Sequence, residues 1–295
     1  MIRFFIILFL LLQTLMANEI NFDIFYDHNT TNEEVNKELD KLLLVLDKNP
    51  NLINKEFGEY NERIFSFFII NSKVGNTGKF DFERLEKVLK FRPDLNYNMY
   101  KIDNSSPLHM AIALGFDHEI KNAISEDEIL RLMEILVKNG ANVTAKELLV
   151  TAYSSDKFEI FKYLLDSKIR DTSRIMLSIA ADIAIFIGHN GLSVQRKKTQ
   201  NSKEREFVKT DKFKNFYEDK IKFLEEALKF IKLSEFNSKE IETFIIINSI
   251  LDNEKAIKIL LDNGLCKLAK ICDFSIETAK HYNSKKILKL LKDMK

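Results

Sequence analysis

The chain has 295 residues, more than a single hydrophobic core usually serves, so its length allows either two domains or one elongated array of repeats. Its 45 Lys and Arg balance 44 Asp and Glu, which argues against a dedicated nucleic-acid-binding protein, because such a domain is usually strongly basic. A hydrophobic content of 45% excludes wholesale disorder, and 8 Gly, 3 Pro and no Trp favour long helices over the many turns of a β-sandwich or barrel.

The first residues, MIRFFIILFLLLQTLMANE, have the layout of a secretory signal peptide. Arg3 supplies the early positive charge, residues 4–12 form an apolar run, and Ala17 precedes the polar sequence. The apolar run is shorter than the roughly 20 residues that span a membrane. We therefore expect residues 1–17 to be removed and the mature protein to be periplasmic or secreted. An uncleaved anchor stays open, because Leu15 is a poor residue two places before the cut.

The next part of the chain contains weakly periodic helical segments. Two of them, at 36–54 and 82–96, are amphipathic, and the apolar segment RIFSFFIINSKVG (63–75) predicts a buried helix. Asn29 lies in the Asn-x-Thr pattern of a glycosylation acceptor and is a candidate modification site, although so short a pattern also arises by chance.

Pairs of helical segments recur after residue 100. The second, amphipathic member of each pair lies at 128–143, 158–168, 254–264 and 284–294, and a shorter, more apolar segment with small residues precedes it at 106–116, 145–155, 174–188, 241–252 and 275–283. Ala152 and Ala279 both lie eight residues before the first apolar residue of the next segment, Ile160 and Ile287. Two unrelated helix pairs would have no reason to share that spacing.

Two short stretches resemble ankyrin repeats. SPLHMA (106–111) is similar to the Thr-Pro-Leu-His-x-Ala signature, with Ser106 in place of Thr, and LVKNGANV (136–143) is similar to the end of the second helix and the turn after it. The resemblance is strongest over 105–168 and 241–295. It implies an all-α fold, an ankyrin-like solenoid of about six stacked helix-turn-helix repeats with one long basic insertion. The residues of the structural motif are Ser106, Pro107, Leu108, His109, Ala111 and Gly140.

The same resemblance gives His109 a structural role. In the family, the ring of this histidine hydrogen-bonds to the backbone of the neighbouring turn, while Pro107 opens the helix. A catalytic or metal-binding histidine would need partners, and the other four histidines have no carboxylate or cysteine at ligand spacing. Gly140 suits the left-handed backbone position that closes a helix.

The spacing of the pairs departs from the repeat at two places. Ala111 and Ala152 are 41 residues apart, compared with an ideal period of about 33 residues, which leaves extra residues around 117–128. A larger departure follows residue 188, where the chain becomes polar, basic and without clear period. We predict a basic insertion loop over 189–216, because insertions in such arrays form loops on one face.

This predicted loop has two interpretations. Residues 192–215 contain eight Lys or Arg and three Asp or Glu. The segment is either a solvated loop or an arm that docks on an acidic partner or on anionic lipid head groups. For the second interpretation, the candidate contact residues are Arg196, Lys197, Lys198, Lys203 and Arg205.

Two cysteines lie six residues apart in NGLCKLAKICDF (263–274). If this stretch is a hairpin loop, Cys266 and Cys272 can face each other and form a disulfide, which persists in an exported protein. If it is one continuous helix, they point to different sides and are small buried hydrophobes. Both interpretations stay open. A zinc site is not expected, because further His or Cys ligands at usable spacing are absent from the sequence.

Together these patterns predict a domain organisation. A signal peptide (1–17) is followed by N-terminal capping and degenerate repeats (18–100), ankyrin repeats (101–188), the basic insertion loop (189–216), and C-terminal ankyrin repeats with a cap (217–295). Atypical end repeats are expected because a stacked array needs a polar outer face at each end.

The function expected from the resemblance is that of a non-enzymatic, exported scaffold. It would bind a partner protein through the concave ankyrin face and, if the basic loop is an arm, through that loop as well. One alternative is an immunity or chaperone-like protein that neutralises an exported toxin or enzyme. Another is a membrane-tethered envelope organiser, which requires an uncleaved N-terminal segment.

No enzymatic activity is expected. The sequence lacks a Gly-x-Ser-x-Gly elbow, a His-Glu-x-x-His helix and a Gly-rich dinucleotide turn. An enzyme would instead need a pocket in which acids and bases with perturbed pKa values converge. We accordingly expect no cofactor, no metal and no nucleic-acid partner. We expect a monomer that associates with a membrane only if residues 1–17 are retained.

Overall fold

The computed structural model describes residues 20–27, 29–57, 62–72, 74, 79–98, 105–114, 124–145, 147–169, 171, 174–193 and 202–293. The chain divides into two compact units, residues 1–145 and 146–295. Regular structure in the described residues is almost entirely helical, which confirms the all-α prediction. The exception is a short antiparallel pair of β1 (Glu56–Phe57) and β2 (Glu62–Arg63). The predicted signal peptide lies outside the described residues.

The first unit packs its helices around one almost wholly apolar helix. Its elements are η1 (Phe22–Phe25), α2 (Asn32–Lys48), η2 (Pro50–Asn54), α3 (Ile64–Asn71), α4 (Phe82–Leu89), α5 (Pro107–Ala113) and α6 (Glu126–Lys138). The helix α3 contacts α2, α4 and α5, and α5 in turn contacts α6. Five of its apolar residues, Ile64, Phe65, Phe67, Phe68 and Ile69, are at most 3% exposed. The buried helix predicted over 63–75 is therefore confirmed, although it ends earlier, at Asn71.

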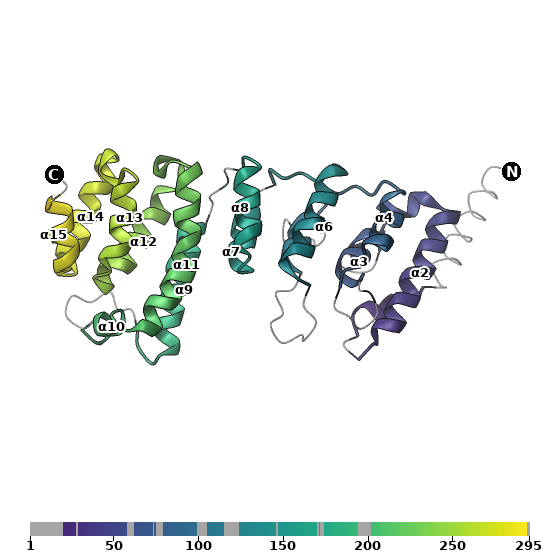
Figure 1. The fold of residues 1–295 in the computed structure, drawn as a ribbon, viewed down its shortest axis with the longest axis horizontal. Helices are drawn as coiled ribbons and strands as arrows, with labels where there is room; N and C mark the ends of the chain where they lie inside the picture. Colours follow the sequence, from purple (N-terminus) through teal and green to yellow (C-terminus); the bar gives the residue numbers. More distant parts are fainter. Residues whose placement is uncertain are drawn as a thin grey trace. The chain divides into compact units, whose positions relative to one another are not determined.

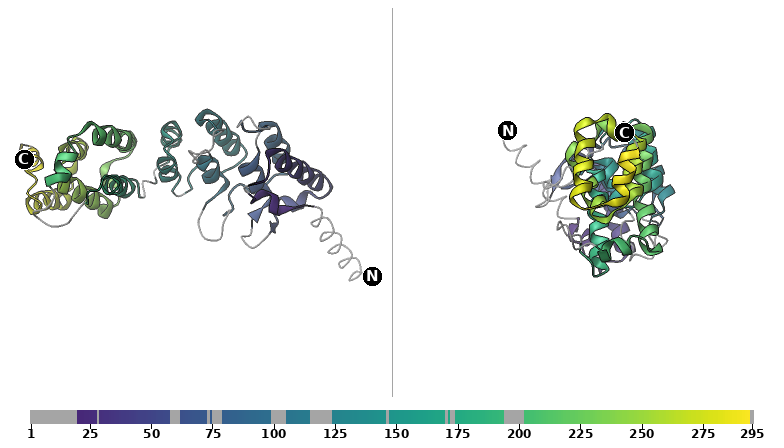
Figure 2. Two further views of the ribbon diagram at one scale, coloured as in Figure 1. Left: turned by 90° about the horizontal axis from the view of Figure 1, so that it is seen from below. Right: turned by 90° about the vertical axis from the view of Figure 1, so that its left-hand side faces the viewer.

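The second unit consists of helix pairs. Its elements are α7 (Leu148–Ser154), α8 (Phe158–Asp166), α9 (Ile175–His189), α10 (Ser202–Phe207), α11 (Asp211–Phe230), η3 (Leu233–Glu235), α12 (Ser238–Leu251), α13 (Glu254–Asp262), η4 (Leu265–Lys267), α14 (Ala269–His281) and α15 (Lys285–Asp293). Contacts pair α7 with α8, α9 with α11, α12 with α13 and α14 with α15. The first helix of each pair contacts the first helix of the next, from α7 to α9, α12 and α14 (Figures 1 and 2).

Aromatic residues join α11 to the helices before it. The Phe223 ring is fully buried, and the rings of Tyr153, Phe158 and Phe161 meet it edge-on at centroid distances of 5.1–5.2 Å. Each edge-to-face contact adds to the gain from burial, because the positive edge of one ring meets the negative face of another. These contacts hold α11 against α7 and α8 within the second unit.

The prediction of a loop over 189–216 is wrong for residues 202–216, most of which are helical. Residues 202–207 form α10, and α11 begins at Asp211, where the Thr210 hydroxyl accepts a hydrogen bond from the Phe213 N–H at 3.3 Å. Phenylalanines help to hold this segment: Phe207 and Phe213 both contact the Phe186 ring of α9, at 6.0 and 6.5 Å between centroids.

Candidate functional site

The Ser106-Pro107-x-His109 motif forms the start of α5. Pro107 occupies the first helical turn, and the Ser106 N–H donates to His109 Nδ1 at 3.1 Å. The Ser106 hydroxyl oxygen lies 2.8 Å from the same nitrogen. His109 is 7% exposed, and Leu108 and Ala111 are fully buried. The His109 ring thus accepts a hydrogen bond from the N-cap backbone N–H of its own helix. This is a capping box in which His stands where Glu is usual.

Gly140 and Asn29 lie on the surface of the first unit. Gly140 has a φ of +101° and follows α6, where the left-handed conformation closes the helix. Asn29 is exposed, and its side-chain amide donates to Asp27 Oδ1 at 3.1 Å. Neither residue lines the cleft described below.

Cys266 and Cys272 are bonded to each other in the structure. Cys266 belongs to η4 and is exposed, whereas Cys272 lies in the first turn of α14 and is 5% exposed. The bond is feasible because the two cysteines do not lie on one continuous helix: η4 ends at Lys267, and α14 begins at Ala269. The cross-link therefore fastens the connection between α13 and α14.

Arg205, predicted as a partner contact, is used inside the second unit. Its guanidinium donates to the carbonyl oxygens of Ile250 at 3.0 Å, Tyr282 at 2.6 Å and Asn283 at 3.2 Å. These carbonyls lie at the C-terminal ends of α12 and α14, where a cation is favoured by the helix dipole. The prediction that Arg205 is a docking residue is corrected accordingly. Lys203 of α10 is exposed, and Arg196, Lys197 and Lys198 lie outside the described residues.

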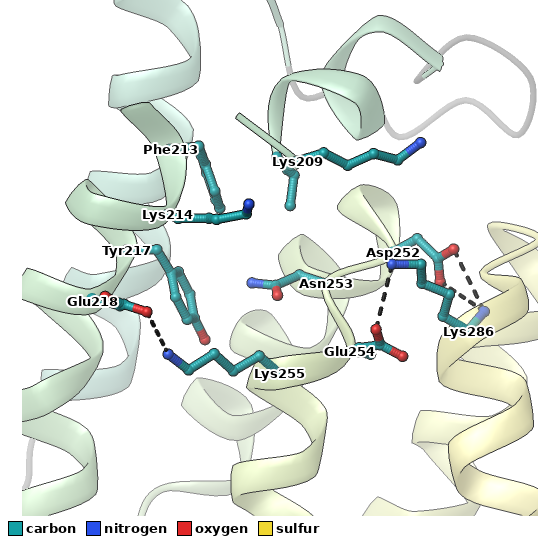
Figure 3. Close-up of a pocket in the computed structure, with 11 residues that line it drawn as sticks. Lys209, Phe213, Lys214, Tyr217, Glu218, Asp252, Asn253, Glu254, Lys255 and Lys286 are labelled. Carbon is teal, nitrogen blue, oxygen red and sulfur yellow. Dashed lines mark hydrogen bonds and ion pairs between the residues drawn. The ribbon is translucent and has the colours of Figure 1, made fainter. Parts of the chain in front are cut away.

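A cleft of about 370 Å³ lies beside this same segment, within the second unit (Figure 3). The α10–α11 turn, the first half of α11, the α12–α13 turn and the start of α15 form its walls. Its lining residues are Val208, Lys209, Phe213, Lys214, Tyr217, Glu218, Asp252, Asn253, Glu254, Lys255 and Lys286. Most of these side chains are polar or charged, so the cleft suits recognition by hydrogen bonds and charge.

Each of the four lysines that line this cleft has an ion-pair partner, which is Glu206 for Lys209 and Asp211 for Lys214. Lys255 Nζ lies 3.1 Å from Glu218 Oε1, and Lys286 Nζ lies 3.4 Å from Glu254 Oε1. The Asp252 carboxylate accepts a hydrogen bond from the Lys286 backbone N–H at 3.2 Å and so caps α15. Burial is the main influence on Asp252 and raises the pKa of its carboxyl, against the opposing effect of these hydrogen bonds.

The N-terminus of α13 opens on the cleft. Asn253 is its N-cap residue, yet among the described residues no side chain caps the first turn. The Asn253 amide donates instead to Asn248 Oδ1 at 2.9 Å. The neighbouring α11 and α12 both have a capping hydrogen bond, from Thr210 and Asn237. The α13 start thus leaves backbone N–H donors at the positive end of a helix dipole.

Tyr217 stands in the wall opposite this helix start. Its ring projects from α11 toward Asn253 and Lys255, stacks on Phe213 at 5.9 Å, and is 3% exposed. Burial strongly raises the pKa of the Tyr217 hydroxyl, an effect that the nearby Asn253 side chain opposes. The hydroxyl is fully buried, and its polar neighbour is the Asn253 side chain.

No protein-family model, curated protein or solved structure matches the chain. In the described residues, no three His, Cys, Asp or Glu side chains are grouped as metal ligands would be. Among the described helices, none has the length and apolar character needed to cross a membrane.

Sequence reasoning singled out the segment that borders the cleft but missed its most distinctive residues. Tyr217 lies on α11, which the sequence patterns do not predict, whereas Asp252 ends the predicted segment 241–252 and Asn253 lies between it and the segment 254–264. The one available signal was Asn253 directly before the acidic start of α13, a pattern typical of an N-cap. That pattern predicts a cap, whereas the structure turns the Asn253 side chain away from it.

Proposed function

We propose that this protein is a non-enzymatic, ankyrin-like scaffold that works outside the cytoplasm and binds a partner protein. The observation that carries the proposal is the contact pattern of the second unit, in which paired helices follow one another and each first helix contacts the next first helix. Stacked pairs of this kind are how repeat proteins build an extended binding surface. The Ser106 to His109 helix start and the turn at Gly140 support the same assignment.

The cysteine pair supports the exported location. Disulfides persist in oxidising compartments and are rare where thiols are kept reduced. The bond between Cys266 and Cys272 has one exposed partner, so in a reducing compartment it would be open to reduction. We infer that the chain completes its fold after export.

An exposed apolar strip on α9 is the leading candidate for partner contact. Leu177 is 42% exposed and Ile185 is 54% exposed, and the exposed Ala181 lies between them on the same helical face. Apolar anchors on a polar surface supply most of the binding energy in protein interfaces. Because α9 is a first helix of its pair, this strip belongs to the side that an ankyrin-like array uses for partners.

Affinity capture from an envelope extract, followed by reconstitution with the purified partner, tests this proposal. One bait would be the mature chain, a second would carry Leu177→Ser and Ile185→Ser, and a third would carry Gln at positions 196, 197 and 198. Binding at a defined stoichiometry, lost in the second bait, supports the scaffold and places contact on α9. Loss in the third bait alone assigns contact to the basic segment. Failure of every bait to retain a protein that binds again when purified overturns the proposal.

A further inference from the structure

We propose that Asn29 is the acceptor for N-linked glycosylation in this protein and receives an oligosaccharide from a lipid-linked diphosphate donor after export. This inference rests on the exported location given in the proposed function. The sequence contains three Asn-x-Ser/Thr patterns, which begin at Asn29, Asn104 and Asn142. Asn104 lies outside the described residues. The surroundings of the other two asparagines differ, and the difference selects Asn29.

The turn that carries Asn29 is exposed and stands on a fixed base. It lies between η1 and α2, and the side chains of Asp27, Asn29 and Thr31 are all exposed. The base is η1, whose Phe25 ring packs against the ring of the buried Phe67 at 4.7 Å between centroids. An exposed loop on a rigid support is accessible to a modifying enzyme. The Asn29 amide can therefore be reached from solvent.

The hydrogen bonds of Asn29 are local. Asp27 Oδ1 accepts from the Asn29 backbone N–H at 2.9 Å and from Asn29 Nδ2 at 3.1 Å. The Thr30 N–H donates to the Asp27 carbonyl at 3.0 Å. Among the described residues, no hydrogen bond joins Asn29 to another turn or helix. The turn can therefore change shape inside an enzyme active site without breaking a link to the rest of the fold.

Asn142 is held more firmly, although it too is exposed. Its backbone N–H donates to Asn96 Oδ1 at 2.7 Å, which ties it to a turn 46 residues away. Its own Oδ1 accepts from the Thr144 N–H at 2.9 Å and from the Thr144 hydroxyl at 2.7 Å. To enter an active site, this pattern would have to break the link between two turns. We therefore expect Asn142 to stay unmodified.

Thr31, the third residue of the Asn29 pattern, also begins a helix. Its hydroxyl donates to Glu34 Oε2 at 2.7 Å and accepts from the Glu34 N–H at 3.3 Å, which caps α2. A transferase that reads this hydroxyl has to open the cap. The change is confined to the first turn of α2, and helix ends open at little cost in free energy.

Asp27 acts as a positioning residue for the acceptor amide. Its carboxylate holds the Asn29 Nδ2 group through a charge-assisted hydrogen bond, which is stronger than a neutral one. Asn29 is the one asparagine of the three that has an acid two residues before it, since Ile102 and Gly140 occupy that place in the other patterns. The same two-residue spacing lets Asp27 bond both the backbone and the side chain of Asn29.

The transfer needs no oxidant or reductant. The Asn29 Nδ2 nitrogen attacks the anomeric carbon of the first sugar, and a carbon–nitrogen bond forms. The bond between that carbon and the diphosphate oxygen breaks, and the lipid diphosphate leaves with the electron pair. The nitrogen loses one proton to a base of the transferase. The donor is thus a lipid-linked oligosaccharide diphosphate, and the product is a glycosylated side-chain amide.

The first test is mass spectrometry of the protein purified from the envelope of the cells that make it. After trypsin digestion, the peptide that ends at Lys37 contains Asn29 and the peptide 139–146 contains Asn142. We expect the mass of one oligosaccharide on Asn29 and none on Asn142. Loss of residues 1–17, read from the same digest, reports export independently. An unmodified Asn29 in exported protein overturns the proposal.

The second test uses the purified, folded mature protein with a purified oligosaccharyltransferase and a lipid-linked oligosaccharide. We again expect transfer to Asn29 and none to Asn142. Absence of transfer to Asn29, or equal transfer to both asparagines, overturns the proposal. This test decides the acceptor even if residues 1–17 prove to be retained in cells.

Variants separate the modification from the structural roles of the same residues. Asn29→Gln should abolish the mass increase. Thr31→Asn keeps a good N-cap residue but removes the hydroxyl, so modification should fall about ten-fold or more while thermal stability is unchanged. Thr31→Ser is the matched control, because it keeps both the cap and the hydroxyl, and it should stay modified. Asp27→Asn should lower modification about three-fold, and Asp27→Glu should restore it.

Equal modification of Thr31→Asn and Thr31→Ser would show that the Asn-x-Thr pattern is not read, and it would overturn the assignment. Transfer is measured by mass and capture is measured by partner binding, so the two experiments fail independently. An unmodified Asn29 leaves the scaffold proposal as it stands, and a bait without a partner leaves the mass spectrum interpretable.

Discussion

In the first unit, asparagine side chains join one turn to the next, whereas in the second unit an arginine joins the ends of two helices. Asn54 accepts from the Asp94 backbone N–H at 2.7 Å. Asn96 donates to the Gly140 carbonyl at 3.0 Å and accepts from the Asn142 N–H at 2.7 Å. Each of these bonds links the turn after one helix to the turn after a later helix, and all are exposed.

The second unit uses a longer and charged side chain for a similar purpose. Arg205 reaches carbonyls 45 residues away on α12 and 77 or 78 residues away after α14. The comparison shows what an insertion changes. Where turns follow at regular intervals, a short amide spans the gap, but where α10 enters from the side, only a long side chain with several donors reaches both helix ends.

The largest expected effect tests whether α11, which follows the insertion, is integral to the second unit. Phe223→Ala should lower the free energy of unfolding by about 3–5 kcal/mol, because a fully buried ring with three edge contacts is replaced by a cavity. Urea denaturation measures this. Phe230→Ala on the same helix is the control, since Phe230 is 39% exposed, and it should cost less than about 1 kcal/mol. Equal effects would show that α11 is peripheral.

Removal of the Arg205 hydrogen bonds to two helix ends should have the next largest effect on stability. Arg205→Gln should lower the free energy of unfolding by about 2–3 kcal/mol, because carbonyls at two helix ends lose charged donors. Lys203→Gln, a neighbouring exposed cation, should change it by less than about 0.5 kcal/mol. Hydrogen exchange should locate the loss at the ends of α12 and α14. If both variants behave alike, the stabilisation comes from net charge rather than from the tie.

The disulfide should contribute somewhat less to the free energy of unfolding than Arg205 does. Replacing Cys266 and Cys272 by Ser should lower the free energy of unfolding by about 2 kcal/mol, because a short loop is no longer closed in the unfolded chain. A reducing agent should lower the stability of the unaltered protein by the same amount and leave the double variant unchanged. Sensitivity of the double variant to the reducing agent would contradict this explanation.

Loss of the asparagine hydrogen bonds between turns of the first unit should have the smallest effect on stability among these substitutions. Asn96→Ala should lower the free energy of unfolding by about 1 kcal/mol, because two exposed hydrogen bonds to the next turn are lost. Asn98→Ala, at an exposed position in the same turn, is the control and should be neutral. If Asn96→Ala lowers the free energy of unfolding as much as Arg205→Gln does, the two kinds of link do not differ in strength and the comparison is contradicted.

One carboxyl in each unit, Glu34 and Asp252, should affect stability in opposite directions as pH changes. In the first unit, hydrogen bonds from Thr31 lower the pKa of Glu34, so its contribution is present above the ordinary carboxyl pKa and is lost as pH falls through the lowered value. In the second unit, burial raises the pKa of Asp252, so the stability linked to its protonation is lost as pH rises through the raised value. Denaturation of Glu34→Gln and Asp252→Asn between about pH 3 and pH 7 measures both slopes. Slopes of the same sign would contradict the assignment.

Local features of the fold could be predicted from the sequence because they depend on neighbours along the chain. Pro107 and Ser106 define a helix start whatever lies around them, and the apolar run around Phe65 and Phe68 can only be stable when buried. The alternating helical segments after residue 100 predicted all-α structure for the same reason. These predictions needed no knowledge of which helix packs against which.

Only the tertiary structure decided the features that join distant residues. The choice between a bonded and an unbonded Cys266 depended on whether the helix breaks between the two cysteines, as it does at Leu268. The role of Arg205 depended on helix ends 45 to 78 residues away. The cleft brings Tyr217 opposite Asn253 because α11 packs beside the α12–α13 turn. Periodicity in the sequence shows which face of a helix is buried. The partners of charged and hydrogen-bonding side chains depend instead on which helices pack together, and the sequence pattern does not determine that packing.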